Sequence, residues 1–195
     1  MLRNSGSTRN WGLAALGFLL LAAIVINLAA TRTRADEGAP IRATFTVTYA
    51  GIPNTAGASF CGGAPMLVNV EAHGGGSSNF GPLSFSLHKT IDPASGAAHG
   101  CLQLIAPNGD ILDAIYDLNL GAPNDHQFAL GTDGRLTFTG GTGRFHGVSG
   151  SATLTAVFAN FYPASSFVGG ASNPLQGVAV YSVDGTLSQP HDDDQ

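Results

Sequence analysis

Lysine and arginine are scarce in this chain of 195 residues, which has eight of them against 13 aspartates and glutamates. Four of the eight lie in the first 35 residues, and those that follow are Arg42, Lys89, Arg135 and Arg144. All 13 acidic residues come after residue 35, so that part of the chain has a net charge of −9. Because affinity for nucleic acid depends on basic side chains that neutralise phosphates, we expect no nucleic-acid partner.

Recognisable catalytic and metal-binding motifs are also missing. None of the six histidines occurs as H-x-H or H-E-x-x-H, the spacings of common metal sites. The stretch around Ser149 is one residue short of a G-x-S-x-G nucleophile elbow. The glycines around residue 142 have neither the G-x-G-x-x-G spacing nor a following Walker lysine. We therefore assign no catalytic residue, no metal site and no cofactor.

A long uncharged segment lies near the N-terminus. It covers residues 11–30 and follows a short region that contains Arg3 and Arg9 but no acidic residue. A basic region before an apolar one is typical of a secretory signal peptide, whereas about 20 apolar residues also suffice to span a bilayer. Residues 1–35 are thus a cleaved signal peptide or a retained membrane anchor. In both cases we expect the rest of the chain to lie outside the cytoplasm, either secreted or tethered. We expect contact with the membrane only through this segment, if it is not cleaved.

The chain has two cysteines, Cys61 and Cys101. An exported protein meets an oxidising compartment, where cysteines pair. We expect a disulfide that closes a loop of about 40 residues and stabilises the fold by roughly 4 kcal/mol. Two free, buried thiols are the alternative.

Apolar and polar residues alternate along much of the remaining sequence. The alternation is clearest at residues 41–49 and returns at 83–88 and 151–158. A period of two is the pattern of a strand with one buried face and one wet face. In residues 83–88 the odd-numbered positions form the apolar face. These segments are predicted to be antiparallel strands.

Turn signals separate the predicted strands. Asn108-Gly109 and Asp133-Gly134 each lie between two apolar runs, and such dipeptides favour two-residue hairpins because both central positions need positive φ. The glycine-rich residues 74–82 are predicted to form a connection between two strands. The whole pattern gives eight or nine strands.

This number of strands suits a closed barrel, which removes the sheet edges that invite aggregation. We predict an all-β fold, a single eight-stranded antiparallel β-barrel, after an N-terminal signal or anchor helix. The barrel domain covers residues 36–190, and residues 191–195 form an acidic tail. No internal domain boundary is apparent in the sequence.

Four titratable side chains on the predicted strands are expected to point to solvent. His73 and His88 fall opposite the apolar faces of their strands, and so do Asp113 and Asp117. A carboxylate or an imidazole on the wet face has little reason to acquire a catalytic pKa. We interpret all four as surface residues.

The most distinctive stretch of the sequence is a turn rich in glycine. Its defining residues are Gly140, Gly141, Thr142, Gly143, Phe145 and Gly150. Glycine permits the positive φ that a chain reversal needs, and we expect such a φ at Gly141. Phe145 is expected to plug one end of the barrel.

This turn resembles that of the allene oxide cyclase and dirigent barrel superfamily, in which a strand runs into Gly-Gly-(Thr/Ser)-Gly-x-Phe. The resemblance implies an eight-stranded barrel with an apolar interior, like that of many small exported bacterial proteins of undefined function. The enzymes of that superfamily guide the cyclisation or coupling of a reactive substrate inside the barrel. No set of inward polar residues in this sequence matches theirs, so no catalytic residue is carried over.

The sequence therefore predicts a binding or interaction module without covalent chemistry of its own. A small apolar ligand or an envelope component is its expected partner. The alternatives are a cofactor-free isomerase or cyclase that acts on a hydrophobic substrate in the barrel, and a purely structural surface protein.

One long connection, residues 159–176, is the candidate contact region. It holds Phe161, Tyr162 and Phe167 among serine, glycine and proline. Aromatic side chains on a loop are costly to leave in water unless they fold onto the barrel or meet a ligand. These three residues are the candidate ligand contacts of a lid or contact surface. The interpretation that the sequence favours is that they cap the open end of the barrel and seal its core.

Overall fold

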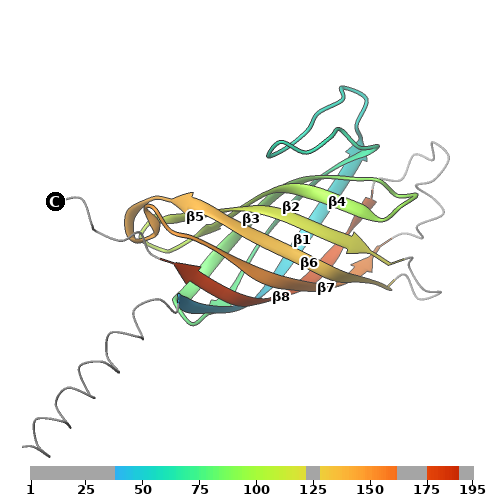
Figure 1. Cartoon of the computed structure of the whole chain (residues 1–195). Helices are drawn as coiled ribbons and strands as arrows, with labels where there is room; N and C mark the ends of the chain where they lie inside the picture. The colour runs from blue at the N-terminus through green and yellow to red at the C-terminus, as the bar shows by residue number, and fades with distance from the viewer. Residues whose placement is uncertain (1–37, 122–127, 162–174, 189–195) are drawn as a thin grey trace, which may run out of the picture. The chain divides into compact units, whose positions relative to one another are not determined.

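The computed structural model of the protein describes residues 38–121, 128–161 and 175–188. In these residues, eight strands form a closed antiparallel barrel in which each strand pairs with the next and β8 pairs with β1 (Figure 1). The elements are β1 (Ala39–Pro53), β2 (Val68–Ser78), β3 (Gly81–Ile91), β4 (Ala97–Ile105), β5 (Ile111–Leu120), β6 (Phe128–Gly141), the short 3-10 helix η1 (Gly143–Phe145), β7 (Ser149–Asn160) and β8 (Leu175–Ser188). The predicted all-β class and eight-stranded barrel are confirmed.

The alternating pattern of the sequence becomes the two surfaces of the barrel wall. In β1, Ile41, Phe45 and Tyr49 are buried, and the residues between them, such as Thr44 and Thr46, are exposed. Burial of every second residue continues around the barrel, and the inward side chains form one hydrophobic core. Removal of this apolar surface from water is what drives the chain to close on itself.

The glycine-rich part of β2 corrects a prediction. Residues 74–76 belong to the strand and pair with β1, although the sequence favoured a connection there. A Cβ atom at Gly74 or Gly76 would collide with the backbone of β1, at the carbonyl oxygens of Thr46 and Thr44 respectively. Glycine here allows a close approach of two strands rather than a turn.

The two predicted hairpin turns have different outcomes. Asn108 and Gly109 lie in the tight connection between β4 and β5, where Gly109 has a φ of 89°. Asp133 and Gly134 lie within β6, so the hairpin predicted at that position is wrong. Asp133 has a φ of 52°, and the pairing register with both neighbouring strands shifts around it. Positive φ serves a β-bulge as well as a turn, and the bulge joins two predicted strands into one.

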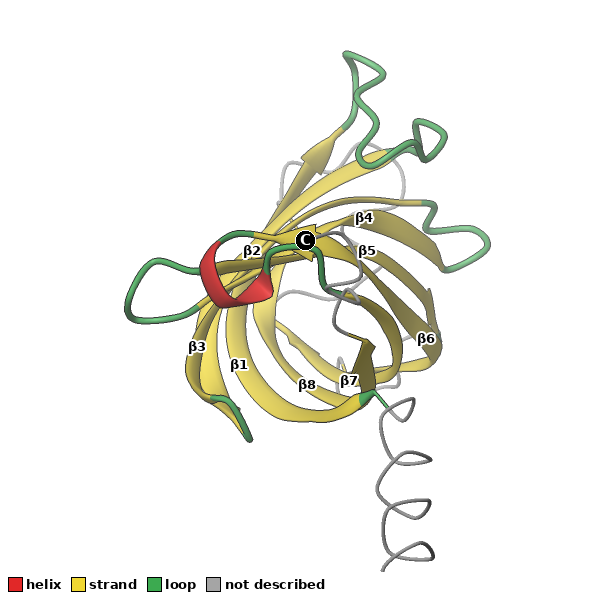
Figure 2. Ribbon diagram, turned by 60° about the vertical axis from the view of Figure 1, so that its left-hand side comes forward, coloured by secondary structure: helices red, strands yellow, loops and turns green. Residues whose placement is uncertain are grey.

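The barrel has two ends with different connections. One end carries residues 79–80, 106–110 and 142–148, the last of which include η1 (Figure 2). We call this the Phe145 end. The other end, which we call the loop end, carries residues 54–67 and 92–96, and β5 and β7 finish there.

Phe145 lies in the hydrophobic core at its own end of the barrel. Its side chain is 3% exposed, and its ring meets that of Phe80 edge to face, with 6.4 Å between centroids. The hydroxyl oxygen of Thr142 accepts a hydrogen bond from the amide of Ile111 at 3.0 Å. The side chains of this turn therefore join β5 to the connection that follows β6.

The glycines of the same turn have two separate roles. Gly140, Gly143 and Gly150 have φ values of 132°, 54° and 144°. Gly141, where positive φ was expected, is not among the residues with positive φ. It is instead packed against the carbonyl oxygen of Ile111, which would collide with a Cβ atom. A side chain at Gly141 is excluded by close approach, not by backbone conformation.

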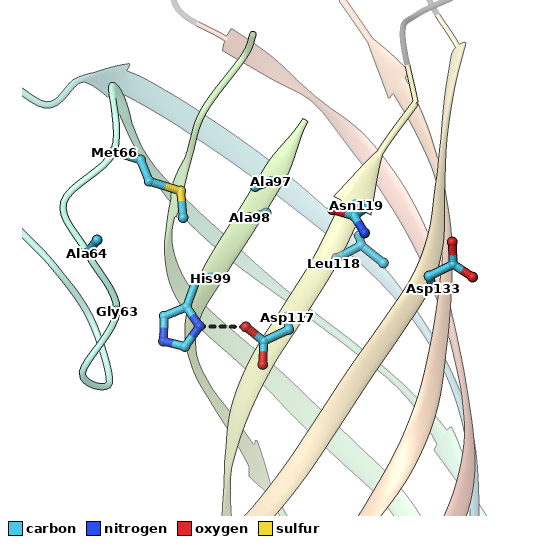
Figure 3. A pocket seen from close by; sticks show the side chains of 10 residues that line it. All are labelled: Gly63, Ala64, Met66, Ala97, Ala98, His99, Asp117, Leu118, Asn119 and Asp133. Atoms are coloured by element: carbon cyan, nitrogen blue, oxygen red, sulfur yellow. Dashed lines mark hydrogen bonds and ion pairs between the residues drawn. The ribbon is translucent and has the colours of Figure 1, made fainter. Parts of the chain in front are cut away.

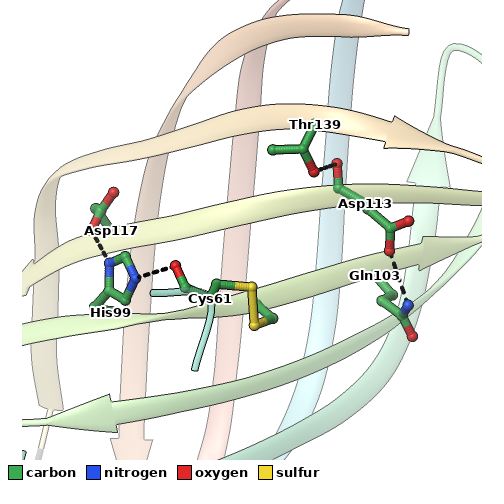
Figure 4. Close-up of a disulfide and its surroundings, with 7 residues drawn as sticks. Cys61, His99, Gln103, Asp113, Asp117 and Thr139 are labelled. Atoms are coloured by element: carbon green, nitrogen blue, oxygen red, sulfur yellow. Dashed lines mark hydrogen bonds and ion pairs between the residues drawn. A yellow bond between two sulfur atoms is a disulfide. The ribbon is translucent and has the colours of Figure 1, made fainter. Parts of the chain in front are cut away.

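The predicted disulfide is confirmed. Cys61 and Cys101 are bonded, with 5.4 Å between their Cα atoms (Figure 4). Cys101 belongs to β4, and Cys61 lies in the connection 54–67. The bond therefore fixes this connection to the outside of the barrel wall.

Within the part of the chain that the structure describes, no helix is long and apolar enough to cross a membrane. The apolar segment 11–30 and the acidic tail 191–195 both lie outside the described residues. Their assignment as an export segment and a tail stays a prediction.

Candidate functional site

The interior of the barrel contains a lysine. Lys89 lies on the inward face of β3, between Leu87 and Ile91, and is 1% exposed. It is the single lysine of the whole chain, since arginine supplies the other seven basic residues. Lysine is almost never fully buried unless it is paired, so the one lysine of this protein occupies the environment least suited to its charge.

Two tyrosine hydroxyls hold the amine of Lys89. Its Nζ lies 3.2 Å from the hydroxyl oxygen of Tyr116 and 3.4 Å from that of Tyr181. The same atom lies 4.9 Å from the ring centroid of Tyr116 and 5.1 Å from that of Phe158. Among the described residues, no carboxylate forms an ion pair with it. The amine is thus hydrogen-bonded and close to aromatic rings, and the described part of the chain supplies no counter-ion for it.

The barrel register explains how Lys89 reaches Tyr116. Lys89 of β3 pairs with Gly100 of β4, which pairs in turn with Tyr116 of β5. The three residues form one row across the wall. A Cβ atom at Gly100 would lie 2.6 Å from the Cα of Lys89. Because the middle position of the row has no side chain, the amine and the phenol can meet above it.

Aromatic rings extend from this amine through the barrel. The ring of Tyr181 stacks on Phe85 with 5.1 Å between centroids, and it meets Phe158 edge to face at 5.6 Å. Phe85 also contacts Phe45 at 5.3 Å. These residues come from β1, β3, β7 and β8. Polar and cationic groups therefore share one cluster with a large apolar surface.

Burial changes the protonation of the cluster. It lowers the pKa of Lys89 from its usual 10.5 to about 7, because the charged amine loses its hydration. Burial also raises the pKa of Tyr181. The pKa of Tyr116 is raised by burial and, to a smaller extent, by the neighbouring Tyr181. At neutral pH the amine therefore exists in comparable amounts as ammonium and as free base, while both tyrosines are protonated. The site combines a nucleophilic or basic nitrogen with two proton donors.

A fourth polar group lies at the same end of the barrel. The hydroxyl of Tyr49 donates a hydrogen bond to the side-chain oxygen of Asn160 at 2.6 Å. Burial raises the pKa of Tyr49 to about 12. Its ring meets that of Phe158 at 5.8 Å, so it is continuous with the cluster around Lys89. A Cβ atom at Gly177 would collide with the Tyr49 hydroxyl, so glycine makes room for it.

A hollow lies on the outside of the wall, beside the connection 54–67 (Figure 3). It has a volume of about 300 Å³, and His99, Asp117 and Asp133 contribute its ionisable groups. The Nδ1 of His99 lies 2.6 Å from Asp117 Oδ1, and its Nε2 lies 3.3 Å from the carbonyl oxygen of Cys61. None of the described residues that line this hollow carries a hydroxyl or thiol group, so they offer the His-Asp pair no nucleophile to activate. Its visible role is to hold the disulfide-linked connection against the wall.

The other predicted surface residues point outward. The rings of His73 and His88 lie side by side with 6.0 Å between centroids, and both residues are on the outer face. Asp113 accepts a hydrogen bond from the side-chain amide of Gln103 at 2.9 Å (Figure 4). In the described residues, no group of three His, Cys, Asp or Glu side chains could hold a metal ion.

The candidate ligand contacts are only partly described. Phe161 is 60% exposed at the loop end, and its amide donates to the carbonyl oxygen of Gln176 at 2.8 Å. Tyr162 and Phe167 lie outside the described residues. The structure therefore brings Phe161 to the barrel rim but does not join it to the interior cluster.

Sequence reasoning missed Lys89, although a signal was present. The apolar face of β3 consists of odd-numbered residues, and the predicted strand stopped at His88. Continued to Ile91, the same alternation places Lys89 inside the barrel. The pattern to look for was a lysine at an inward, odd-numbered position of the strand, with the apolar Ile91 at the next inward position.

Comparison with known proteins gives no relatives. No family model matches the chain, and no curated protein or solved structure is significantly similar to it. The function must therefore be argued from the site itself.

Proposed function

We propose that this barrel is an extracytoplasmic binding module that holds a small, mostly apolar ligand in its interior. The polar head of the ligand contacts Lys89, Tyr116 and Tyr181, and its apolar body packs on the aromatic rings around them. The head is an oxygen acceptor, a carboxylate or a carbonyl. Binding sites of this kind are mostly apolar, with a few convergent polar groups that fix the orientation of the ligand.

The observation that carries the proposal is the burial of Lys89 without a carboxylate among the described residues. A buried charge is costly unless it is paired, and two hydroxyl groups with nearby rings compensate only part of that cost. An acceptor oxygen on a ligand would supply the missing partner. Eight-stranded barrels are wide enough either to be filled by side chains or to hold one small ligand.

Further features support an extracytoplasmic location for the protein and its membership of a barrel superfamily. The apolar segment 11–30 and the Cys61–Cys101 bond agree with an oxidising compartment outside the cytoplasm. A barrel of eight sequential strands and the buried Phe145 after the Gly140-Gly141 turn agree with membership of the allene oxide cyclase and dirigent superfamily. Both assignments are part of the proposal.

A cofactor-free isomerase or cyclase is the second candidate. It is favoured by one observation, the meeting of an amine whose pKa is lowered to about 7 with two protonated phenols. Such a set can take a proton from one atom of a substrate and give one to another.

Thermal unfolding with simple amphiphiles tests the binding function. Octanoate, decanoate and octanol are added to the wild-type domain and to Lys89→Met, which is similar in length and uncharged. Stabilisation of the wild type by the carboxylates, with a clearly smaller effect on Lys89→Met, supports the proposal, because only a ligand of the native state raises the melting temperature. Equal stabilisation of both proteins would show that the amphiphile binds without Lys89 and would overturn the assigned head-group site. No stabilisation of either protein would support a purely structural barrel.

A further inference from the structure

The choice of lysine at position 89 needs its own explanation. Arginine supplies all the other basic residues of the chain, and arginine is the better partner for a carboxylate because its fork binds both oxygens. Arginine stays charged in every protein environment, however, whereas a lysine loses its proton readily when it is buried. A lysine at position 89 can therefore supply a neutral amine inside the barrel, which an arginine could not do.

We infer that Lys89 captures an apolar aldehyde inside the barrel as a reversible imine. This inference rests on the proposed function, since the barrel must first admit the ligand, and it specifies the ligand class. The geometry that carries it is a single nitrogen with two phenol groups at 3.2 and 3.4 Å and aromatic rings at 4.9 and 5.1 Å.

The reaction balances without any oxidant or reductant. The lone pair of Lys89 Nζ forms a bond to the carbonyl carbon, the carbonyl π electrons move to oxygen, and the nitrogen loses one proton while the oxygen gains one, which gives a carbinolamine. The nitrogen then loses its second proton, the hydroxyl takes up a proton and leaves as water, and a carbon–nitrogen double bond remains. One aldehyde and one amine give one imine and one water. Hydrolysis reverses each step and releases the aldehyde.

The neighbours of Lys89 suit each stage of this reaction. Tyr116 and Tyr181 contact the same nitrogen, so either hydroxyl can protonate the oxygen that departs from the carbon next to it. The aromatic rings stabilise a protonated imine as they would an ammonium. The complete burial of Lys89 limits the access of water, which protects the imine from hydrolysis. Burial also keeps part of the amine unprotonated at neutral pH, because it lowers the pKa of Lys89 to about 7.

Reductive trapping tests the inference directly. The folded domain is incubated with octanal and cyanoborohydride at pH 7, and the adduct is found by intact mass and peptide mapping. Because Lys89 is the single lysine, the only other reactive amine is the N-terminus, which falls in a different peptide. The expected result is one stable adduct at Lys89.

Two variants serve as controls. Lys89→Arg removes the primary amine and cannot form an imine, so it should give no adduct beyond the N-terminus. In the second, Thr48→Lys is combined with Lys89→Met, which moves the amine to an exposed position on β1. An exposed lysine has about a thousandfold smaller neutral fraction at pH 7 than one with a pKa near 7. We expect labelling at Lys89 to be at least about tenfold faster.

The outcomes separate the two claims. Octanoate binding without an adduct at Lys89 would overturn the imine and leave the binding function standing. The imine would also be overturned if the Thr48→Lys control were labelled as fast as Lys89. No octanoate binding and no adduct would overturn both proposals.

Discussion

The two ends of the barrel differ in what they bury. At the Phe145 end, Phe145 packs on Phe80, and its neighbours in the core are apolar. Toward the loop end, Lys89 and two tyrosine hydroxyls lie inside the same continuous wall. One strand, β3, contributes to both, since it begins beside Phe80 and reaches Lys89 two residues before its end. The barrel wall closes around apolar side chains at the Phe145 end, so the polar groups around Lys89 are not needed to form the wall and require a separate explanation.

Stability gives the sharpest contrast between the ends. Burial of apolar side chains at the Phe145 end stabilises the fold, whereas burial of the Lys89 amine destabilises it. Natural proteins accept such a cost mainly at functional sites. Substitutions at the two ends should therefore have opposite signs.

Lys89→Met is expected to have the largest effect. Burial lowers the pKa of Lys89 from 10.5 to about 7, so between these values the unfolded chain binds more protons than the native protein. The free energy of unfolding of the wild type then rises with pH through this window. The penalty is fully present below pH 7 and amounts to roughly 5 kcal/mol. At pH 6, Lys89→Met should be more stable by up to about this amount, measured by urea unfolding at several pH values.

The pH dependence of the same variant supplies the control. Lys89→Met should lose the rise between pH 7 and pH 10 but keep a decline above pH 10, because burial raises the pKa values of Tyr49, Tyr116 and Tyr181. With raised values, the native tyrosines hold protons that the unfolded chain has released. A wild-type protein with flat stability from pH 7 to pH 10 would contradict the account.

Phe145→Ala is the matching change at the other end. The ring is 3% exposed within the core, so its removal should lower the free energy of unfolding by about 3 to 5 kcal/mol. The loss should not depend on pH between 6 and 10, in contrast to the effect at Lys89. Chemical unfolding of both variants side by side would show this, and an unchanged stability would show that Phe145 does not seal the barrel.

Gly100→Ala tests the row that joins the amine to Tyr116. The added Cβ would lie 2.6 Å from the backbone of Lys89, and a forced shift of this kind costs about 1 to 3 kcal/mol. Gly75→Ala is the control, since its Cβ would meet only one atom, at an ordinary distance of 3.5 Å. Thermal unfolding should separate the two variants. Equal melting temperatures would mean that β3 and β4 adapt freely at this position.

Much of the wall could be predicted from local sequence, because strand alternation and the Asn108-Gly109 turn are local features. The glycines of β2 could not, since their role is to admit the backbone of β1, which belongs to a distant part of the sequence. The bulge at Asp133 could not be predicted either, because the Asp133-Gly134 dipeptide is equally typical of a two-residue hairpin turn. The disulfide was predictable from compartment and cysteine count alone.

The candidate site was harder to predict than the wall. Lys89 and Tyr181 are 92 residues apart in sequence, and no local pattern indicates that their side chains meet. Continued strand alternation would have placed Lys89 on the inner face of β3, but lysine is usually exposed, which argued against an inward position. The barrel closure, not any motif, brings the amine and the hydroxyls together.

Phe161→Ser should have the smallest effect on stability. The ring is 60% exposed at the rim, and exposed side chains rarely contribute more than about 0.5 kcal/mol. If Phe161 contacts the ligand, the variant should unfold like the wild type yet lose part of its stabilisation by decanoate. A clear fall in melting temperature without ligand would instead assign Phe161 to a cap over the barrel.

The protonation of Lys89 can be measured directly, and it tests whether this lysine lies inside the barrel with no carboxylate partner among the described residues. Because the chain has one lysine, a sample labelled with ¹³C at the lysine Cε gives one NMR signal, and its chemical shift can be followed from pH 5 to pH 11. The account predicts a midpoint at a pKa of about 7, in place of the usual 10.5. A midpoint near 10.5 would contradict it, because it would mean that the amine is hydrated or paired with a carboxylate.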